Sequence, residues 1–295
     1  MACFDGDIIE VEGFVANSAR VLFEENGDGE ILMVNSAGIY VGTNNKVFLI
    51  CDSSWGYVPA GIAIDDFRGL TNLLNLRSGE GFSYSDGLLK FSSAKLKIVA
   101  KYASRRIPQV LRPQKSLIEQ AALELADLKK TRGLSMLSLP IVLEDQDTEA
   151  LSVNPFCERA CRGILDLLDA LKNENTEKMR NAICGLLGLG VGLTPSADDV
   201  MMGMLYVFRE LYDGTGDTVR AFVDELPMLC DDLTNAVSAS YIKAIYSGDI
   251  YERADRVLGA LCGEADLKIA ELTEVGGSSG CEMLLGILCA LKILC

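Results

Sequence analysis

The sequence has 295 residues, of which 49% are hydrophobic, and its 42 acidic and 27 basic side chains give a net charge of −15. This length fits one large or two medium domains with a substantial core. A general nucleic-acid binder is normally basic, because phosphate neutralisation supplies most of its affinity, so that class is excluded. The apolar run Met283–Cys295 contains Lys292 and is too short to cross a bilayer. The N-terminus lacks the pattern of a signal peptide, and we expect a cytoplasmic protein with no membrane partner.

The chain contains ten cysteines and no histidine. No two cysteines form a CxxC pair, and most lie among apolar residues, where a free thiol behaves as a small hydrophobic group. The lack of histidine removes the commonest neutral zinc ligand and the usual base of a serine or cysteine hydrolase. We therefore expect reduced, mostly buried thiols and assign no metal ligands. A site built from cysteine alone is the weaker alternative.

The first third of the chain predicts β-structure. Short β-branched or aromatic runs are typical of strands, and they occur at 21–23, 31–34, 38–41, 47–50, 82–84, 88–91 and 95–99. Turn residues separate them at 26–29, 43–45 and, as a hairpin signal, at Asp86-Gly87. A short helix is expected over 66–73. Many short, closely spaced strands favour a small barrel or sandwich.

The rest of the chain predicts helices. Apolar residues at helical spacing and suitable caps indicate helices over 116–130, from Asn154-Pro155 onward, and over 176–187, 197–211, 217–225, 232–246, 249–262 and 280–294. Gly248 and Gly263 are suitable helix stops. Residues 140–143 favour an additional strand. The predicted fold class is α+β, with a β-rich domain at 1–113, a helix and connection at 114–150, and a helical domain at 151–295.

Two glycine-rich segments open helices in the C-terminal half. The first runs from Gly188 through Gly192, Thr194, Ser196, Asp198 and Asp199 to Gly203, and the second runs from Gly276 through Gly277, Ser278, Ser279 and Glu282 to Gly286. Both carry a serine, an acid three residues later and a glycine four residues after the acid. Serine, acid and glycine share one helical face, so we expect the two helices to cross at Gly203 and Gly286 and to bring their N-termini together.

This repeated frame has two interpretations. A serine followed three residues later by an acid is the pattern of a capping box, which is a purely structural device. Alternatively, flexible loop glycines and free backbone amides at a helix N-terminus favour an anion such as phosphate or carboxylate. Asp198 is not needed for a cap. It could hold Mg²⁺, orient a substrate amide or complement the helix dipole.

Two further segments carry polar or charged side chains. Thr234 and Asn235 lie near a predicted helix start, where they either cap the helix or add contacts to the same site. Seven cations and no acid lie between Lys95 and Lys115. This basic segment is either an edge strand guarded by lysines or a source of positive charge for an anionic substrate or an acidic partner.

At Gly192-Leu-Thr-Pro-Ser-Ala-Asp-Asp199 through Gly203 the sequence resembles a bacterial family, the AllH subunit of oxamate carbamoyltransferase. The family hallmark has glycine where Ala197 stands here. A second hallmark, Gly-His-Ser-Ser-Gly, corresponds to Gly276–Gly280, with Gly277 in place of the usual histidine. Val58-Pro59-Ala60-Gly61-Ile62 is also similar to the family.

The resemblance implies a β-rich N-terminal part, a helical C-terminal part and work with other protein subunits of a complex. The implied reaction moves a carbamoyl group between carbamoyl phosphate and oxamate in ureide (allantoin) catabolism. The candidate catalytic residues are Asp198, Asp199 and Glu282. The candidate residues for binding a small anionic substrate are Gly192, Thr194, Ser196, Gly277, Ser278, Ser279, Thr234 and Asn235. No cofactor is assigned, with Mg²⁺ as one option. The alternative is a non-catalytic subunit that binds a small anion or serves assembly.

Overall fold

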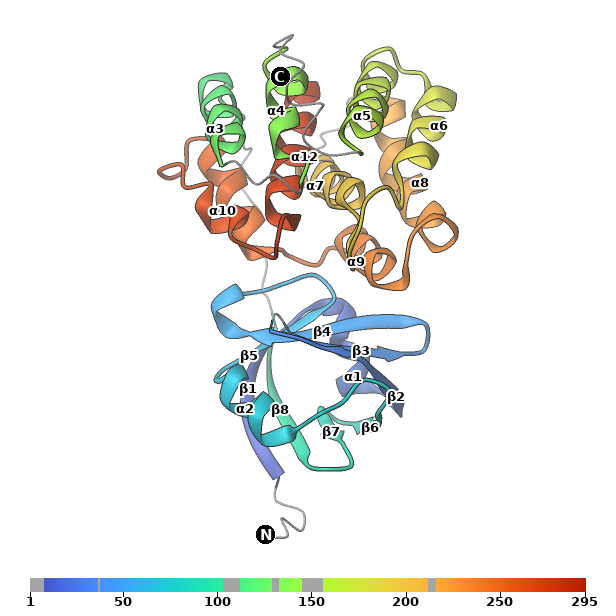
Figure 1. Cartoon of the computed structure of the whole chain (residues 1–295), viewed down its shortest axis with the longest axis vertical. Coiled ribbons are helices and arrows are strands. Elements are labelled where there is room, and N and C mark those ends of the chain that lie inside the picture. Colours follow the sequence, from blue (N-terminus) through green and yellow to red (C-terminus); the bar gives the residue numbers. More distant parts are fainter. Residues whose placement is uncertain (1–7, 37, 103–111, 129–132, 145–155, 212–215) are drawn as a thin grey trace. The chain divides into compact units, whose positions relative to one another are not determined.

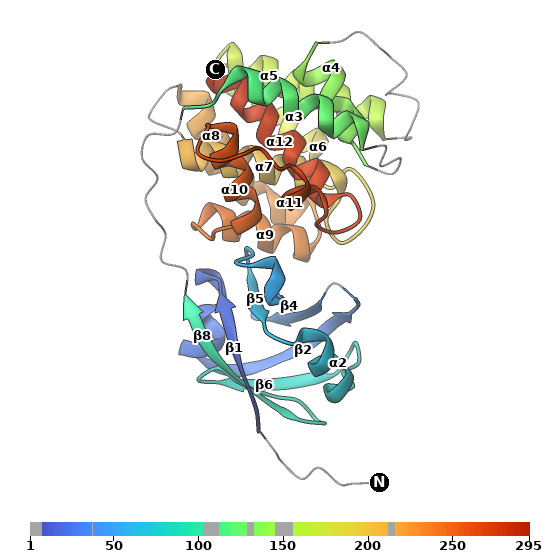
Figure 2. The ribbon, with the colours of Figure 1, turned by 90° about the vertical axis from the view of Figure 1, so that its left-hand side faces the viewer.

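The computed structural model describes residues 8–36, 38–102, 112–128, 133–144, 156–211 and 216–295 (Figures 1 and 2). The chain divides into two compact units. The barrel unit comprises Met1–Arg106 and Ser247–Arg253, and the helical unit comprises Ile107–Tyr246 and Ala254–Cys295. Each unit is described by itself below.

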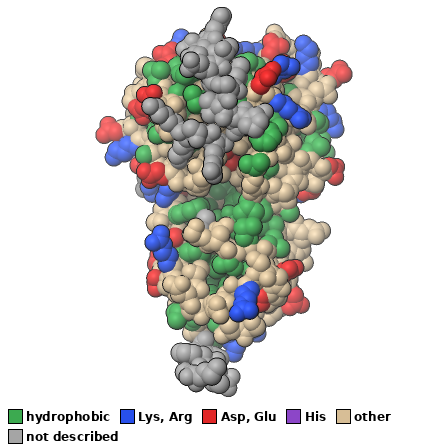
Figure 3. Space-filling model, viewed as in Figure 1, with side chains coloured by type: hydrophobic (Ala, Val, Ile, Leu, Met, Phe, Trp, Pro, Cys, Tyr) green, Lys and Arg blue, Asp and Glu red, His purple; other side chains and the backbone are tan. Residues whose placement is uncertain are grey.

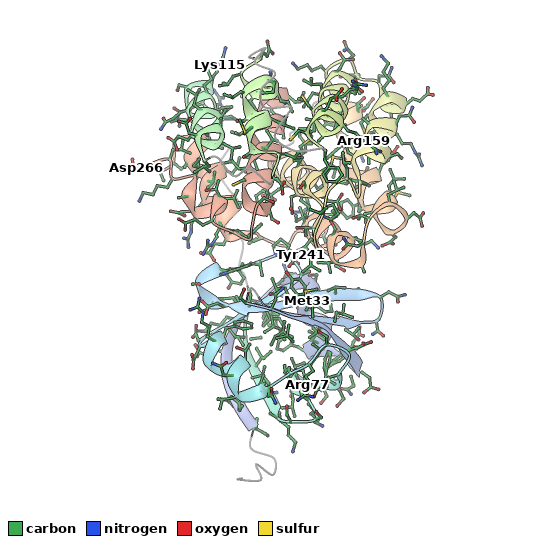
Figure 4. All side chains as sticks on the ribbon, viewed as in Figure 1. Met33, Arg77, Lys115, Arg159, Tyr241 and Asp266 are labelled. Carbon is green, nitrogen blue, oxygen red and sulfur yellow. The ribbon has the colours of Figure 1, made fainter. Side chains whose placement is uncertain are left out.

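The barrel unit is a closed barrel in which the strands follow the order β1-β5-β4-β3-β2-β6-β7-β8. Its strands are β1 (Ile8–Val15), β2 (Asn26–Val34), β3 (Ile39–Thr43), β4 (Lys46–Asp52), β5 (Gly61–Ile64), β6 (Gly81–Ser85), β7 (Leu88–Lys90) and β8 (Lys95–Tyr102). Neighbouring strands are antiparallel except β1 with β8 and β4 with β5. The expected β-rich N-terminal barrel is therefore confirmed. Side chains fill its interior in Figure 4.

Glycines in β2 explain why the turn predicted at residues 26–29 was wrong. These residues belong to a strand that pairs with β6. A Cβ atom on Gly27 would lie 2.8 Å from the Tyr84 ring, and one on Gly29 would lie 2.6 Å from the Phe82 ring. Glycine therefore makes room for two large aromatic side chains inside a narrow barrel.

Other local predictions for the barrel unit had mixed outcomes. Residues 21–23 form the short helix α1 (Val21–Glu24) instead of a strand. Strands β1 and β5 were not predicted. The turn at 43–45 and the Asp86-Gly87 hairpin are confirmed, since Asn44, Asn45 and Asp86 all have positive φ. The helix expected over 66–73 is α2 (Phe67–Leu74).

The basic strand β8 is not an edge strand, so the interpretation of its lysines as protection of a sheet edge was wrong. It pairs with β1 on one side and with β7 on the other. Two of its lysines form ion pairs, Lys97 with Asp86 and Lys101 with Glu12. Part of the segment, residues 103–111, lies outside the described residues.

The barrel unit also includes the distant segment Ser247–Arg253. The buried Asp249 accepts hydrogen bonds from the backbone N–H groups of Ser18 at 3.1 Å and Ala60 at 3.0 Å, and from the Ser18 hydroxyl. Glu252 accepts from the N–H of Tyr57 at 3.1 Å. Two carboxylates thus fasten this segment to the barrel.

The helical unit contains no strand in its described residues. Its elements are α3 (Lys115–Asp127), the 3-10 turn η3 (Ser135–Leu137), α4 (Ser138–Val142), α5 (Cys157–Lys172), α6 (Thr176–Leu186), α7 (Ser196–Leu211), α8 (Asp217–Leu233), α9 (Ala236–Tyr246), α10 (Glu252–Leu261, whose first two residues are in the barrel unit), α11 (Ala270–Thr273) and α12 (Ser279–Leu294). Helices α7 and α12 lie at the centre of the unit (Figures 1 and 2). Most of their residues are buried, in agreement with their strongly apolar sequences.

Several helix boundaries differ from those predicted. Residues 140–142 belong to α4, and the additional strand predicted at 140–143 was wrong. Helix α8 runs past residue 225 and includes the buried Pro227, so α9 begins at Ala236 instead of 232. Helix α10 begins at Glu252 instead of 249. The cap predicted at Asn154-Pro155 lies outside the described residues.

The described cysteines are free thiols, and six of the nine are buried, as the sequence predicts. In the described part of the chain no cluster of three or more metal-ligating side chains occurs. No helix there combines the length and the apolar character needed to cross a membrane. On the face drawn in Figure 3, acidic and basic side chains are interspersed over the helical unit.

Candidate functional site

Helices α7 and α12 cross in backbone contact at two glycines. A Cβ on Gly203 would overlap the carbonyl oxygen of Met283 and lie 2.9 Å from the nitrogen of Ile287. A Cβ on Gly286 would overlap the carbonyl oxygen of Val200 and lie 3.1 Å from the Cα of Gly203. The predicted crossing is therefore confirmed. It is the reason that glycine is used seven residues into each helix, where it would otherwise cost about 1 kcal/mol relative to alanine.

The crossing brings the two helix N-termini together, and their side chains pair across it. Ser279 of α12 lowers the pKa of Asp199 of α7 by its hydrogen-bonding effect, and Ser196 of α7 does the same to the pKa of Glu282 of α12. Thr194, just before α7, donates to Asp199 over 3.0 Å and lies 3.0 Å from the Ser279 hydroxyl oxygen. Each serine of the repeated frame thus acts on the acid of the other copy.

This exchange replaces the capping boxes that the sequence suggested. Asp198 and Asp199 donate their backbone N–H groups to the carbonyl oxygen of Pro195. At the start of α7 a backbone oxygen, and not a side-chain oxygen, therefore accepts these hydrogen bonds. In α12 the cap residue is Ser278, and its side chain makes no capping bond. The capping-box interpretation was therefore wrong.

Asp199 and Glu282 form a buried carboxyl pair. Their relative exposures are 4% and 1%, and each carboxyl acts on the pKa of the other. Burial raises the pKa of both groups, and the charge of Glu282 raises the pKa of Asp199 further. Two carboxylates buried close together cannot both stay ionised cheaply, so burial and mutual repulsion favour one shared proton on the pair. Below we call Thr194, Ser196, Asp199, Ser278, Ser279 and Glu282 the crossing cluster.

Asp198 points into a second set of polar groups. Its fully buried carboxyl accepts from the N–H of Gly188 at 2.7 Å, from the Ser238 hydroxyl at 2.6 Å and from the Thr234 hydroxyl. Burial raises its pKa, and these three hydrogen bonds oppose the rise. Asp198 therefore ties the first glycine-rich loop to the junction of α8 and α9. Asn235 caps α9 by accepting from the N–H groups of residues 237 and 238.

The outer side of the crossing cluster is accessible. Gly192 and Gly277 are exposed, while Thr194, Ser278 and Ser279 are half-buried. Among the described residues we find no acceptor for the N–H groups of Gly277 and Ser278. Hydroxyl and amide donors thus form a rim above the buried carboxyl pair. No described lysine or arginine is among the main causes of the pKa shifts of Asp198, Asp199 or Glu282.

A third backbone segment, which sequence reasoning missed, completes the crossing cluster. The N–H of Leu134, just before η3, donates to Glu282 Oε1 over 3.2 Å. A Cβ on Gly133 would lie 2.8 Å from the Cβ of Ser278 and 3.1 Å from Glu282 Oε1. A single glycine after a helix reads as an ordinary helix stop, so only the fold reveals this contact.

An open groove of about 720 Å³ lies elsewhere in the helical unit, between α5 and α6. It shares no residue with the crossing cluster. Its lining mixes both signs of charge: Glu158, Arg159 (labelled in Figure 4), Arg162, Asp166, Asp169 and Lys178. Its charged lining residues are exposed, so it lacks the desolvated polar groups that distinguish the crossing cluster.

Comparison with known proteins places the crossing cluster in a recognisable family region. No solved structure matches the chain. A family model does match, and the matched region contains both glycine-rich helix starts, the crossing glycines, Asp198 and α9. This match confirms the resemblance expected from the sequence: residues 186–291 correspond to the family described as oxamate carbamoyltransferase subunit AllH.

Proposed function

We propose that this chain is a subunit of a carbamoyltransferase that moves a carbamoyl group between carbamoyl phosphate and oxamate in ureide (allantoin) catabolism, together with other protein subunits. The match over residues 186–291 supports the enzyme class. The observation that carries the proposal is the crossing cluster. There a buried carboxyl pair, whose pKa values burial raises, lies next to three half-exposed hydroxyls.

The chemistry of the transfer fits this arrangement. The amide nitrogen of oxamate attacks the carbamoyl carbon, the bond from that carbon to the phosphate oxygen breaks, and the nitrogen loses one proton. The Thr194 and Ser279 hydroxyls contact the substrate and pass the proton toward the carboxyl pair, which is too buried to touch the substrate itself. The free N–H groups of Gly277 and Ser278 bind a substrate carboxylate or phosphate.

The charge state of the site limits how anions bind. Three carboxyl groups without a described cation would repel an anion, and a proton on the Asp199–Glu282 pair removes one negative charge. The remaining repulsion requires a cation from outside the described residues, either from another subunit or as Mg²⁺. We therefore expect binding of carbamoyl phosphate alone to be weak and to strengthen in the assembled complex.

The decisive measurement is turnover of carbamoyl phosphate and oxamate by the chain reconstituted with its partner subunits. We expect Ser279→Ala and Thr194→Val each to lower kcat by about 10²-fold, the lower end of the effect of a positioned proton-transfer group. Ser116→Ala, at an exposed position of α3, is the matched control and should leave turnover unchanged. Wild-type-like turnover in both site variants would rule out this role for the crossing cluster.

A non-catalytic anion-binding or assembly subunit is the second candidate, and Gly277 favours it. The chain has no histidine, and glycine stands where the resembled family usually has one. Titration calorimetry with carbamoyl phosphate, oxamate and oxalurate, each with and without Mg²⁺, separates the candidates. Binding of a ligand by a complex that shows no turnover would support the second candidate. If none of the three ligands gave a binding signal, both small-anion proposals would be excluded.

Restoring the histidine should be tolerated and should raise turnover. A Cβ on Gly277 meets no atom within 4 Å, so we expect Gly277→His to change the unfolding free energy by no more than about 0.5 kcal/mol. The imidazole would add a base that titrates near neutral pH beside Ser278 and Ser279. Gly276→His is the matched control. Its φ of +63° makes a side chain cost roughly 1–2 kcal/mol, and thermal unfolding should separate the two variants. Turnover of Gly277→His at or below the wild-type rate would show that the position takes no part in proton transfer.

A further inference from the structure

The two acids of the crossing cluster receive different kinds of hydrogen-bond donor. Glu282 accepts from the Leu134 backbone N–H at 3.2 Å through Oε1, and from the Ser278 hydroxyl at 3.1 Å through Oε2. The Ser196 hydroxyl lowers the pKa of Glu282 as well. Among the described residues Asp199 accepts from the Thr194 hydroxyl and from no backbone N–H, and the Ser279 hydroxyl also acts on its pKa. Glu282 is thus the one acid of the pair that a backbone N–H holds.

This difference decides which acid is ionised. A backbone N–H can only donate, whereas a hydroxyl can rotate and either donate or accept. A fixed donor is strongest when it faces a charged oxygen, by roughly twofold over a neutral one. The ionised form is therefore favoured on Glu282. Asp199 faces hydroxyls that can adapt to an acid proton, and it lies beside a further carboxyl, Asp198.

We infer that Gly133 and Leu134 position Glu282 as the ionised member of the pair and leave the shared proton on Asp199. Gly133 allows this because a side chain there would collide with Ser278 and press on Glu282 Oε1. The segment lies outside the matched region 186–291, so it is an additional part of the site. The inference concerns the site of the proposed function, yet it holds for the folded chain without substrate.

The proton assignment gives the two halves of the cluster distinct roles. Asp199, with Thr194 and Ser279, forms the proton-donating half: its carboxyl passes the shared hydrogen to Glu282 and takes up in its place the substrate proton that the Thr194 or Ser279 hydroxyl relays. Glu282, with Ser196 and Ser278, forms the proton-accepting half. The two acids belong to different helices that touch at Gly203 and Gly286, so the contact between the helices fixes the distance over which the proton is shared.

Infrared spectroscopy of the full chain at neutral pH tests the assignment without any substrate. Protein labelled with ¹³C in aspartate carboxyls and protein labelled in glutamate carboxyls are compared. The C=O band of a buried, protonated carboxylic acid should shift with the aspartate label only. Asp199→Asn should remove the band, whereas Asp198→Asn should leave most of it. A band that shifts with the glutamate label, or that survives in Asp199→Asn, or that is absent from the wild type would overturn the inference.

Gly133→Ala tests the positioning role, with Gly185→Ala as the control, since a Cβ on Gly185 meets nothing within 4 Å. Displacing the Leu134 N–H should move part of the acid band to the glutamate label, which a merely structural glycine would not do. An unchanged label response in Gly133→Ala would overturn the role of this segment. If turnover assays failed while the aspartate band was present, the proposed function would fall and the proton assignment would stand.

Discussion

Replacing Gly203 by alanine is expected to destabilise the helical unit by about 3 kcal/mol or more, the upper range for overpacking. The added Cβ would overlap the backbone of α12 at Met283 and crowd Ile287. Backbone atoms cannot rotate away as a side chain can, so the two helices must separate along buried apolar surface. Gly286→Ala should have a similar effect, because its Cβ would overlap the backbone of α7 at Val200.

Thermal unfolding followed by helical circular dichroism measures this loss. For a unit of this size each kcal/mol shifts Tm by roughly 2–4 °C, so we expect a decrease of roughly 6–12 °C. Gly185→Ala is the matched control, because it lies in α6 with open space at its Cβ. There alanine should raise stability by about 0.5–1 kcal/mol through helix propensity. Equal Tm values for Gly203→Ala and Gly185→Ala would refute a backbone-tight crossing.

The crossing glycines show what sequence spacing can reveal. Serine, acid and glycine at fixed helical spacing predicted one face, and the repetition of that frame predicted a meeting of two such faces. Both expectations follow from helix geometry alone. The partners of the serines did not follow, because the same spacing also fits a capping box. Only the fold distinguishes a serine that bonds its own helix from one that bonds the opposite helix.

The barrel shows a similar limit. Alternation and turn residues predicted most of its strands, yet the run Asn26-Gly27-Asp28-Gly29 read as a turn. Glycine has two uses that look alike in a sequence, backbone freedom and lack of a side chain. Which use applies depends on Phe82 and Tyr84, more than fifty residues away. The same holds for Leu134, whose part in the site is a backbone N–H and leaves no trace in residue type.

Asp198→Ala should have the second large effect on stability, because we expect it to lower the free energy of unfolding by about 3 kcal/mol. The substitution leaves the buried Ser238 hydroxyl without its acceptor, and it also removes the acceptor of the half-buried Thr234 hydroxyl and of the Gly188 N–H. Each unsatisfied group costs roughly 1–3 kcal/mol, and relief of the buried charge offsets part of the sum. Asp232→Ala, an exposed acid near the end of α8, is the control and should stay within about 0.5 kcal/mol of wild type.

The pH dependence of Asp198→Asn separates the charge of this residue from its hydrogen bonds. Burial raises the pKa of Asp198 in the folded chain above its unfolded value of about 3.9. Its folded state therefore binds the proton more tightly, and its contribution to stability falls as the pH rises from about 4 through the folded pKa. Asparagine does not titrate there, so the stability deficit of Asp198→Asn should shrink over that range, as measured by urea unfolding at a series of pH values. A deficit that grows with pH would mean that the three donors stabilise the carboxylate more than burial penalises it, and Asp198 would then be a charged anchor for the glycine-rich loop.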